Sequence, residues 1–120
     1  MLFCARELVA LCLGRRTLAR VTGASMAPTL EDGAVIAVRR GRGGLPTLGQ
    51  VVVVTDPRDG RRLVKRCSSV AADTFAVASD NPHGATDSRT FGSLSRSDFV
   101  GVARWSWSLR GGLRDLRRTS

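Results

Sequence analysis

Short apolar runs separated by turn-forming residues recur along most of the chain. Residues 35–38 (VIAV) and 51–54 (VVVV) are β-branched runs of the kind that predicts strands. Because the four valines are apolar on both faces, we expect their strand at the centre of a sheet. Residues 56–60 (DPRDG) are a strong turn signal, and residues 61–67 should return beside the valines as a hairpin.

Two further strands are predicted at residues 74–78 and 99–107, the second with Trp105 and Trp107 alternating in register. A long polar loop, residues 79–89, lies between them, and long loops in small domains often carry function. The predicted fold class is therefore mainly β.

The amino-terminal segment, residues 1–20, has a different pattern. Its apolar run, residues 8–13, is far shorter than the roughly 20 apolar residues of a membrane-spanning helix, and charged residues flank it. No transmembrane anchor is expected. We predict a short amphipathic helix that ends near Gly14 and packs on the core, with contact with a membrane surface as the alternative. The main domain would span residues 21–107, followed by a basic tail, 108–120, as a short helix or a disordered end.

Composition restricts the classes of function. The chain has 120 residues and a net charge of +9, which can favour nucleic acid. However, its arginines are not interleaved with aromatics, and no zinc-finger or helix-turn-helix pattern is present, so no nucleic-acid partner is expected. Three cysteines without metal-binding spacing and a single histidine predict neither a metal site nor a cofactor. The odd cysteine count favours a reducing compartment, the cytoplasm.

Lys65 differs from every other basic residue of the chain. Eighteen of the 19 are arginines, and Lys65 is the single lysine. Arginine stays protonated at ordinary pH and cannot act as a general base, whereas lysine can. On the predicted strand, Lys65 shares a face with Leu63 and Cys67. Burial among apolar neighbours lowers the pKa of a lysine, so Lys65 is either a general base or a strand lysine whose ammonium reaches water.

A serine on a tight turn is the complementary candidate. Residues 23–30 (GASMAPTL) surround Ser25 with small side chains. Gly23 permits close approach of another chain, and Pro28 fixes its own φ. A serine hydroxyl is a weak nucleophile until a base accepts its proton. Ser25 and Lys65 are therefore the leading nucleophile and base.

These segments resemble the motifs of type I signal peptidases. Residues 23–30 look like the nucleophile box of that family, and residues 63–66 (LVKR) look like its lysine box. Residues 80–81 (DN) and 87–89 (DSR) look like its third box. The motifs occur in the family's order and together span residues 21–104, most of the chain.

The resemblance implies a signal-peptidase-like catalytic β-fold and an endopeptidase with a Ser–Lys dyad. Ser25 would attack the scissile carbonyl, and Lys65 would take and return its proton. The substrate would bind as an added strand, with the backbone N–H of Ser25 holding the oxyanion. Asp87 would pair with Arg89, and residues 80–81 would organise their loop through backbone hydrogen bonds. The residues implied to line or support the site are Gly23, Met26, Pro28, Asp80, Asn81, Asp87, Ser88 and Arg89.

The chain departs from the family's usual pattern at three positions. It has Gly23 where many members have a small hydroxyl residue, and Ser79 where many have a glycine. It has Ala85 where a serine commonly hydrogen-bonds the lysine. The resemblance therefore leaves open which group orients the lysine, with Thr86 and Ser88 as the neighbouring hydroxyls.

Small members of this family without an anchor are similar to the maturation proteases of nickel-type superoxide dismutase, which remove a short leader. The length of the chain, the expected lack of an anchor and the loop 79–89 favour this subfamily. The expected partner is a precursor protein with an amino-terminal leader, with a nickel superoxide dismutase precursor as the preferred candidate.

Four alternatives stay open at this point. A signal peptidase or an organelle inner-membrane-type peptidase would cleave exported proteins at a membrane. A LexA-like self-cleaving regulator shares the dyad but needs an upstream DNA-binding region, for which 20 residues leave no room. A non-enzymatic basic module would bind nucleic acid and be indifferent to loss of Ser25. A triad of Ser25, His83 and an aspartate is the fourth, although His83 is expected to be an exposed loop residue.

Overall fold

A computed structural model describes the chain over most of its length. The described residues are 2–4, 8–13, 16–21, 26, 29–30, 32–41, 43–80, 92–109 and 111–116. Their regular elements are β1 (Leu2–Cys4), β2 (Leu8–Leu13), β3 (Arg16–Val21), β4 (Val35–Arg40), β5 (Val51–Thr55), β6 (Arg62–Val70), β7 (Thr74–Ala78), β8 (Leu94–Ser95), the 3-10 helix η1 (Arg96–Asp98), β9 (Phe99–Ser108) and β10 (Gly112–Asp115).

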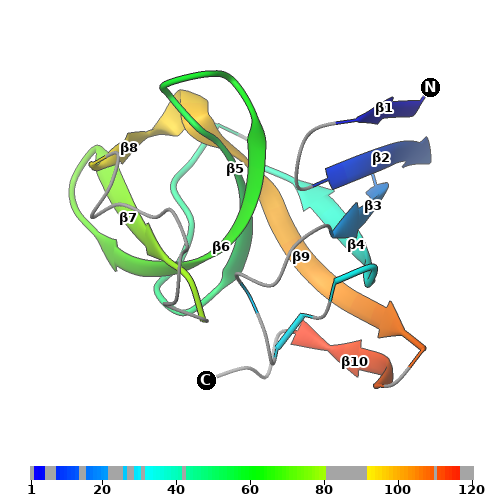
Figure 1. Ribbon diagram of the computed structural model, residues 1–120. Helices are drawn as coiled ribbons and strands as arrows, with labels where there is room; N and C mark the ends of the chain where they lie inside the picture. The colour runs from blue at the N-terminus through cyan, green and yellow to red at the C-terminus, as the bar shows by residue number, and fades with distance from the viewer. Residues whose placement is uncertain are drawn as a thin grey trace.

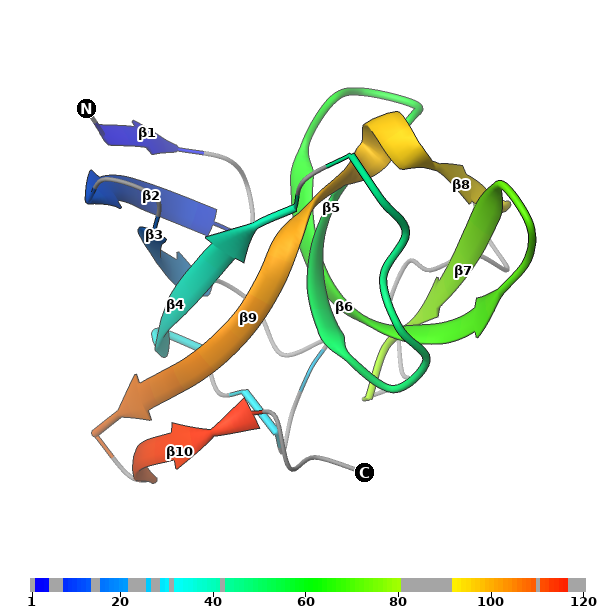
Figure 2. The same ribbon diagram turned by 180° about the vertical axis from the view of Figure 1, so that it is seen from behind.

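The strands form one antiparallel sheet in the order β1-β2-β3-β4-β9-β5-β6-β7-β8. The long strand β9 joins its two halves, with β4 along one side and β5 along the other. Beyond the end of β5, strand β10 pairs with the last residues of β9. Figures 1 and 2 show β5 to β8 curling round on one side of β9, with β1 to β4 on the other. The predicted mainly β fold class is confirmed.

The strands predicted from apolar runs are confirmed. β5 lies between β9 and β6, and its residues 51–54 are all buried, as expected of a central strand. The turn at residues 56–60 closes the β5–β6 hairpin, in which Val52 lies opposite Lys65. Gly33, in the turn before β4, has a φ of +87°, a conformation that favours glycine.

The predicted amino-terminal helix is wrong. Residues 2–4 and 8–13 are strands, and Leu13 pairs with Arg16 to make a hairpin of β2 and β3. A six-residue apolar run does not distinguish a helix from a strand, and a helix of that length is marginal without packing. Here β3 is paired with β4 on one side, and on its other side it supplies hydrogen-bond partners for the backbone of β2. The basic tail also contains a strand, β10, where a short helix or a disordered end was expected.

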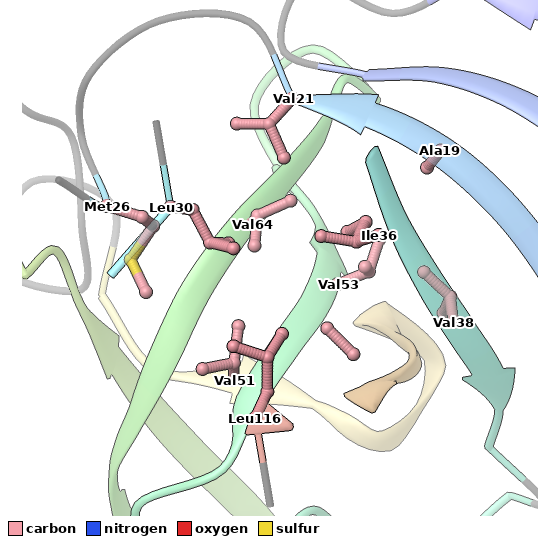
Figure 3. Packing of buried hydrophobic residues seen from close by; sticks show 11 residues of the cluster. Ala19, Val21, Met26, Leu30, Ile36, Val38, Val51, Val53, Val64 and Leu116 are labelled. Carbon is pink, nitrogen blue, oxygen red and sulfur yellow. The ribbon is translucent and has the colours of Figure 1, made fainter. Parts of the chain in front are cut away.

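Two buried clusters fill opposite faces of the β5–β6 hairpin. Val51 and Val53 belong to the first cluster, which also contains Val64, Met26 and Leu30 (Figure 3). The second cluster contains the intervening valines of β5 together with Leu63, Cys67, Phe75, Val77 and Leu94. Alternation along β6 therefore sends neighbouring residues to different environments, which decides how the candidate site is built.

Candidate active site

Lys65 lies in the middle of β6 and is buried, with 2% of its surface exposed. Its neighbours on the same face, Leu63 and Cys67, belong to the second cluster, as the alternation predicted. Burial excludes the alternative of a strand lysine whose ammonium reaches water. The Nζ atom donates a hydrogen bond of 2.9 Å to Ser79 Oγ, directly after β7. The sheet therefore holds the Lys65 amine among apolar side chains, an environment that suits a lysine acting as a proton acceptor.

Asp80, the residue after Ser79, binds Arg66, the residue after Lys65. The Arg66 guanidinium donates from Nε to Asp80 Oδ1 at 2.9 Å and from Nη2 to Oδ2 at 2.8 Å. Such a paired arrangement fixes both the distance and the orientation of the two groups. Arg66 Nη1 also donates to the carbonyl oxygen of Gly49 at 2.9 Å. One arginine thus joins the lysine box, the third box and the loop before β5.

Thr29 brings the nucleophile box into the same network. Its hydroxyl donates to Asp80 Oδ2 at 2.5 Å. Nearby, the backbone N–H of Leu30 donates to the carbonyl of Met26 at 2.8 Å. Met26 and Leu30 are buried in the cluster that contains Val64, the residue before Lys65 (Figure 3). Residue 26, which directly follows Ser25, is therefore anchored to the core against β6.

The charges in this network are mutually stabilising. Burial alone would raise the pKa of Asp80, but hydrogen bonds from Arg66 and Thr29 and the charge of Arg66 outweigh it, so the pKa lies below its ordinary value. The hydrogen bond with Asp80 likewise raises the pKa of Arg66. The ion pair is thus fully charged at neutral pH. Burial raises the pKa of the Cys67 thiol, which keeps this neighbour of Lys65 protonated.

Several predicted site residues lie outside the described residues: Gly23, Ser25, Pro28, Asn81, Asp87, Ser88 and Arg89, and also His83. Their roles stay predictions. Of the others, Met26 is a core residue, and Asp80 acts through its side chain to Arg66 and Thr29. The family resemblance implies backbone hydrogen bonds for Asp80 and gives no role to Arg66 or Thr29.

The contact of Ser79 with Lys65 is not predicted from the sequence. The signal that could have indicated it is the hydroxyl residue at position 79, where the family usually has a glycine.

Among the described residues, no group of three or more His, Cys, Asp or Glu side chains is placed to bind a metal. No helix among the described residues is both long and apolar enough to cross a membrane.

The profile of the Peptidase S24-like family matches residues 8–103, about four fifths of the chain. The chain belongs to this family and is, at the level of class, a serine peptidase. A search of curated proteins found no match. The match covers β2 through the first half of β9, and so includes Lys65, Arg66, Ser79 and Asp80.

Proposed function

We propose that the protein is a Ser–Lys dyad endopeptidase in which Ser25 is the nucleophile and Lys65 the general base. The observation that carries the proposal is the burial of Lys65, with its Nζ held at 2.9 Å from Ser79 Oγ. In support, Met26, the residue after Ser25 in the sequence, is packed in the core in the same cluster as Val64 of β6. The family match supports serine-peptidase chemistry generally.

The reaction would use two proton transfers in each half. Neutral Lys65 Nζ accepts the proton of Ser25 Oγ as the oxygen attacks the scissile carbonyl carbon. The tetrahedral intermediate then collapses, its C–N bond breaks, and the Lys65 ammonium gives the proton to the leaving amine. Water next attacks the acyl-serine ester with Lys65 again as base. Proton return to Ser25 releases the carboxylic acid and restores the enzyme.

The proposed substrate is a precursor protein with a short amino-terminal leader, of which a nickel superoxide dismutase precursor is the first candidate. The resemblance of residues 79–89 and of the three boxes to the maturation proteases supports this choice. The proposed location is the cytoplasm. Cleavage of exported proteins at a membrane is the alternative that the substrate experiment must separate.

The test compares wild-type protein with Ser25→Ala on purified precursors, with mass spectrometry of the products. Ser93→Ala is the matched control, because Ser93 is an exposed serine just before β8. We expect one cleavage at the leader junction by wild type and the control and none by Ser25→Ala, with unchanged circular dichroism. Normal cleavage by Ser25→Ala would remove the nucleophile assignment.

The choice of precursor tests the substrate. Cleavage of a nickel superoxide dismutase precursor in buffer, but not of a signal-peptide precursor in detergent micelles, is expected. The opposite preference would favour the signal-peptidase alternative. Incubation of the enzyme alone gives a further check, since shortening of the chain itself would favour a self-cleaving regulator.

A further inference from the structure

We propose that Ser79 is the positioning residue of the dyad, whose hydroxyl oxygen fixes the direction in which the Lys65 amine presents its lone pair. This inference rests on the proposed function of Lys65. Its starting observation is the 2.9 Å hydrogen bond from Lys65 Nζ to Ser79 Oγ. A lysine side chain has four rotatable bonds, and burial alone does not choose among its rotamers. A hydrogen-bond acceptor at a fixed position favours the rotamers that bring Nζ to it.

The register of the sheet delivers Ser79 to this place. In the β6–β7 ladder, Val70 pairs with Phe75, but the register shifts between Cys67 and Ser69, and Arg66 then pairs with Ala78. Extended by one residue, the shifted register places Ser79 opposite Lys65. The register shift is a one-residue bulge in β6, and without it the same extension would place Asp80 opposite Lys65. Bulges of this kind re-aim a side chain next to an active site.

Ser79 is itself held from both sides. Ala78 before it is in the β7 ladder opposite Arg66. Asp80 after it is bound by the Arg66 guanidinium through two hydrogen bonds and by the Thr29 hydroxyl through a third. The ladder therefore holds the residue before Ser79, and the ion pair holds the residue after it. The Cα–Cβ bond of Ser79 is thus held in place, so only rotation about χ1 moves the hydroxyl oxygen to which Lys65 donates.

A hydrogen-bond acceptor beside Nζ restricts the direction of the amine lone pair. A neutral amine has two N–H donors and one lone pair, and only the lone pair can take the proton of Ser25. If one N–H donates to Ser79 Oγ, the lone pair and the second N–H are confined to the remaining directions round Nζ. Displacement of a reacting atom by about 1 Å can cost on the order of 100-fold in rate. Ser79 would thus act on kcat through Lys65, without touching the substrate.

The test uses Ser79→Ala, Ser79→Thr and the control Ser93→Ala in the full chain, assayed on the precursor cleaved by the wild type. We expect Ser79→Ala to lower kcat about 10- to 100-fold while KM changes less than about threefold. Ser79→Thr keeps a hydroxyl at the same atom and should recover most of kcat. The control should match wild type. Urea unfolding midpoints of the variants show whether any loss comes from folding.

The outcomes separate this inference from the proposed function. Wild-type kcat in Ser79→Ala, alongside inactive Ser25→Ala, overturns the positioning role and leaves the dyad in place. Equal losses in Ser79→Ala and Ser79→Thr also overturn it, because the hydroxyl would then be irrelevant. If Ser79→Ala proves unfolded, a folded Ser79→Thr with near wild-type kcat supports the role, and one with a low kcat contradicts it. Full activity of Ser25→Ala rejects the proposed function itself.

Discussion

Replacement of Asp80 by asparagine tests the network that links the three sequence motifs. Asp80 accepts two hydrogen bonds from Arg66 and one from Thr29, at 2.5 to 2.9 Å. The side chains of Asp80 and Arg66 are 17% and 22% exposed, so water screens the pair only partly. A hydrogen bond to a charged group contributes about 1.5–3 kcal/mol. Because asparagine retains one acceptor but no charge, we expect Asp80→Asn to lower the free energy of unfolding by about 2 kcal/mol at pH 7.

The pH dependence of this loss follows from the lowered pKa of Asp80. Unfolded Asp80 titrates near its ordinary pKa of about 3.9. The stabilisation is therefore fully present above that pH and is lost as the pH falls through the lower, folded-state pKa. The difference in unfolding free energy between wild type and Asp80→Asn should shrink below about pH 4. Other carboxylates titrate in both proteins and largely cancel.

Urea unfolding followed by circular dichroism, repeated from pH 7 to about pH 2.5, measures this difference. Asp73→Asn is the matched control, since Asp73 is 87% exposed and lies 3.8 Å from Arg96. It should change the unfolding free energy by less than about 0.5 kcal/mol. A penalty for Asp80→Asn that equals the control, or one that stays constant on acidification, would refute the reasoning.

Two further predictions concern stability away from Lys65. In Gly101→Ala the new Cβ would lie 2.3 Å from the carbonyl oxygen of Arg39 on β4. We therefore expect the free energy of unfolding, measured in urea, to fall by about 1–3 kcal/mol. Gly44→Ala is the control and should change it very little, because a Cβ at Gly44 meets open space. Asp56 is fully buried and its pKa is lowered chiefly by the hydrogen bond from the Arg58 side chain. Asp56→Asn should therefore cost about 1–3 kcal/mol at pH 7, less in acid, yet leave precursor cleavage unchanged. Cleavage lost in a folded Asp56→Asn would count against a site confined to the network round Lys65.

The parts of the fold with strong local signals could be predicted from the sequence. The β5–β6 hairpin follows from a run of four valines and a turn sequence, and alternation along the strand places Lys65 on the face of Leu63 and Cys67. The sequence leaves open whether the ammonium of Lys65 reaches water, and the structure decides this, because Lys65 is 2% exposed. The amino-terminal strands could not be predicted, since the choice of strand over helix at residues 8–13 depends on pairing with β3. Tertiary pairing outweighed a local pattern that was ambiguous.

The site could be predicted only as far as its individual residues. Lys65 and Asp80 carry chemistry that a motif reveals, whereas their partners depend on the three-dimensional register. A one-residue bulge between Cys67 and Ser69 decides whether Ser79 or Asp80 lies opposite Lys65. No local sequence feature predicts this bulge. The pairing of Arg66 with Asp80 likewise joins residues 14 positions apart.

Cleavage by Lys65→Arg is the most direct test of the account. The swap keeps a positive charge in a chain that already contains 18 arginines, but guanidinium cannot act as a base. Because Lys65 is only 2% exposed, Lys65→Met is measured beside it as an uncharged variant of similar length that suits a buried position. Arg62→Lys, a change on the same strand, is the control. We predict at least about a 100-fold loss of kcat in both Lys65 variants, with native circular dichroism in at least Lys65→Met, and little loss in the control. Cleavage at near wild-type rate by either Lys65 variant would contradict the claim that Lys65 is the general base.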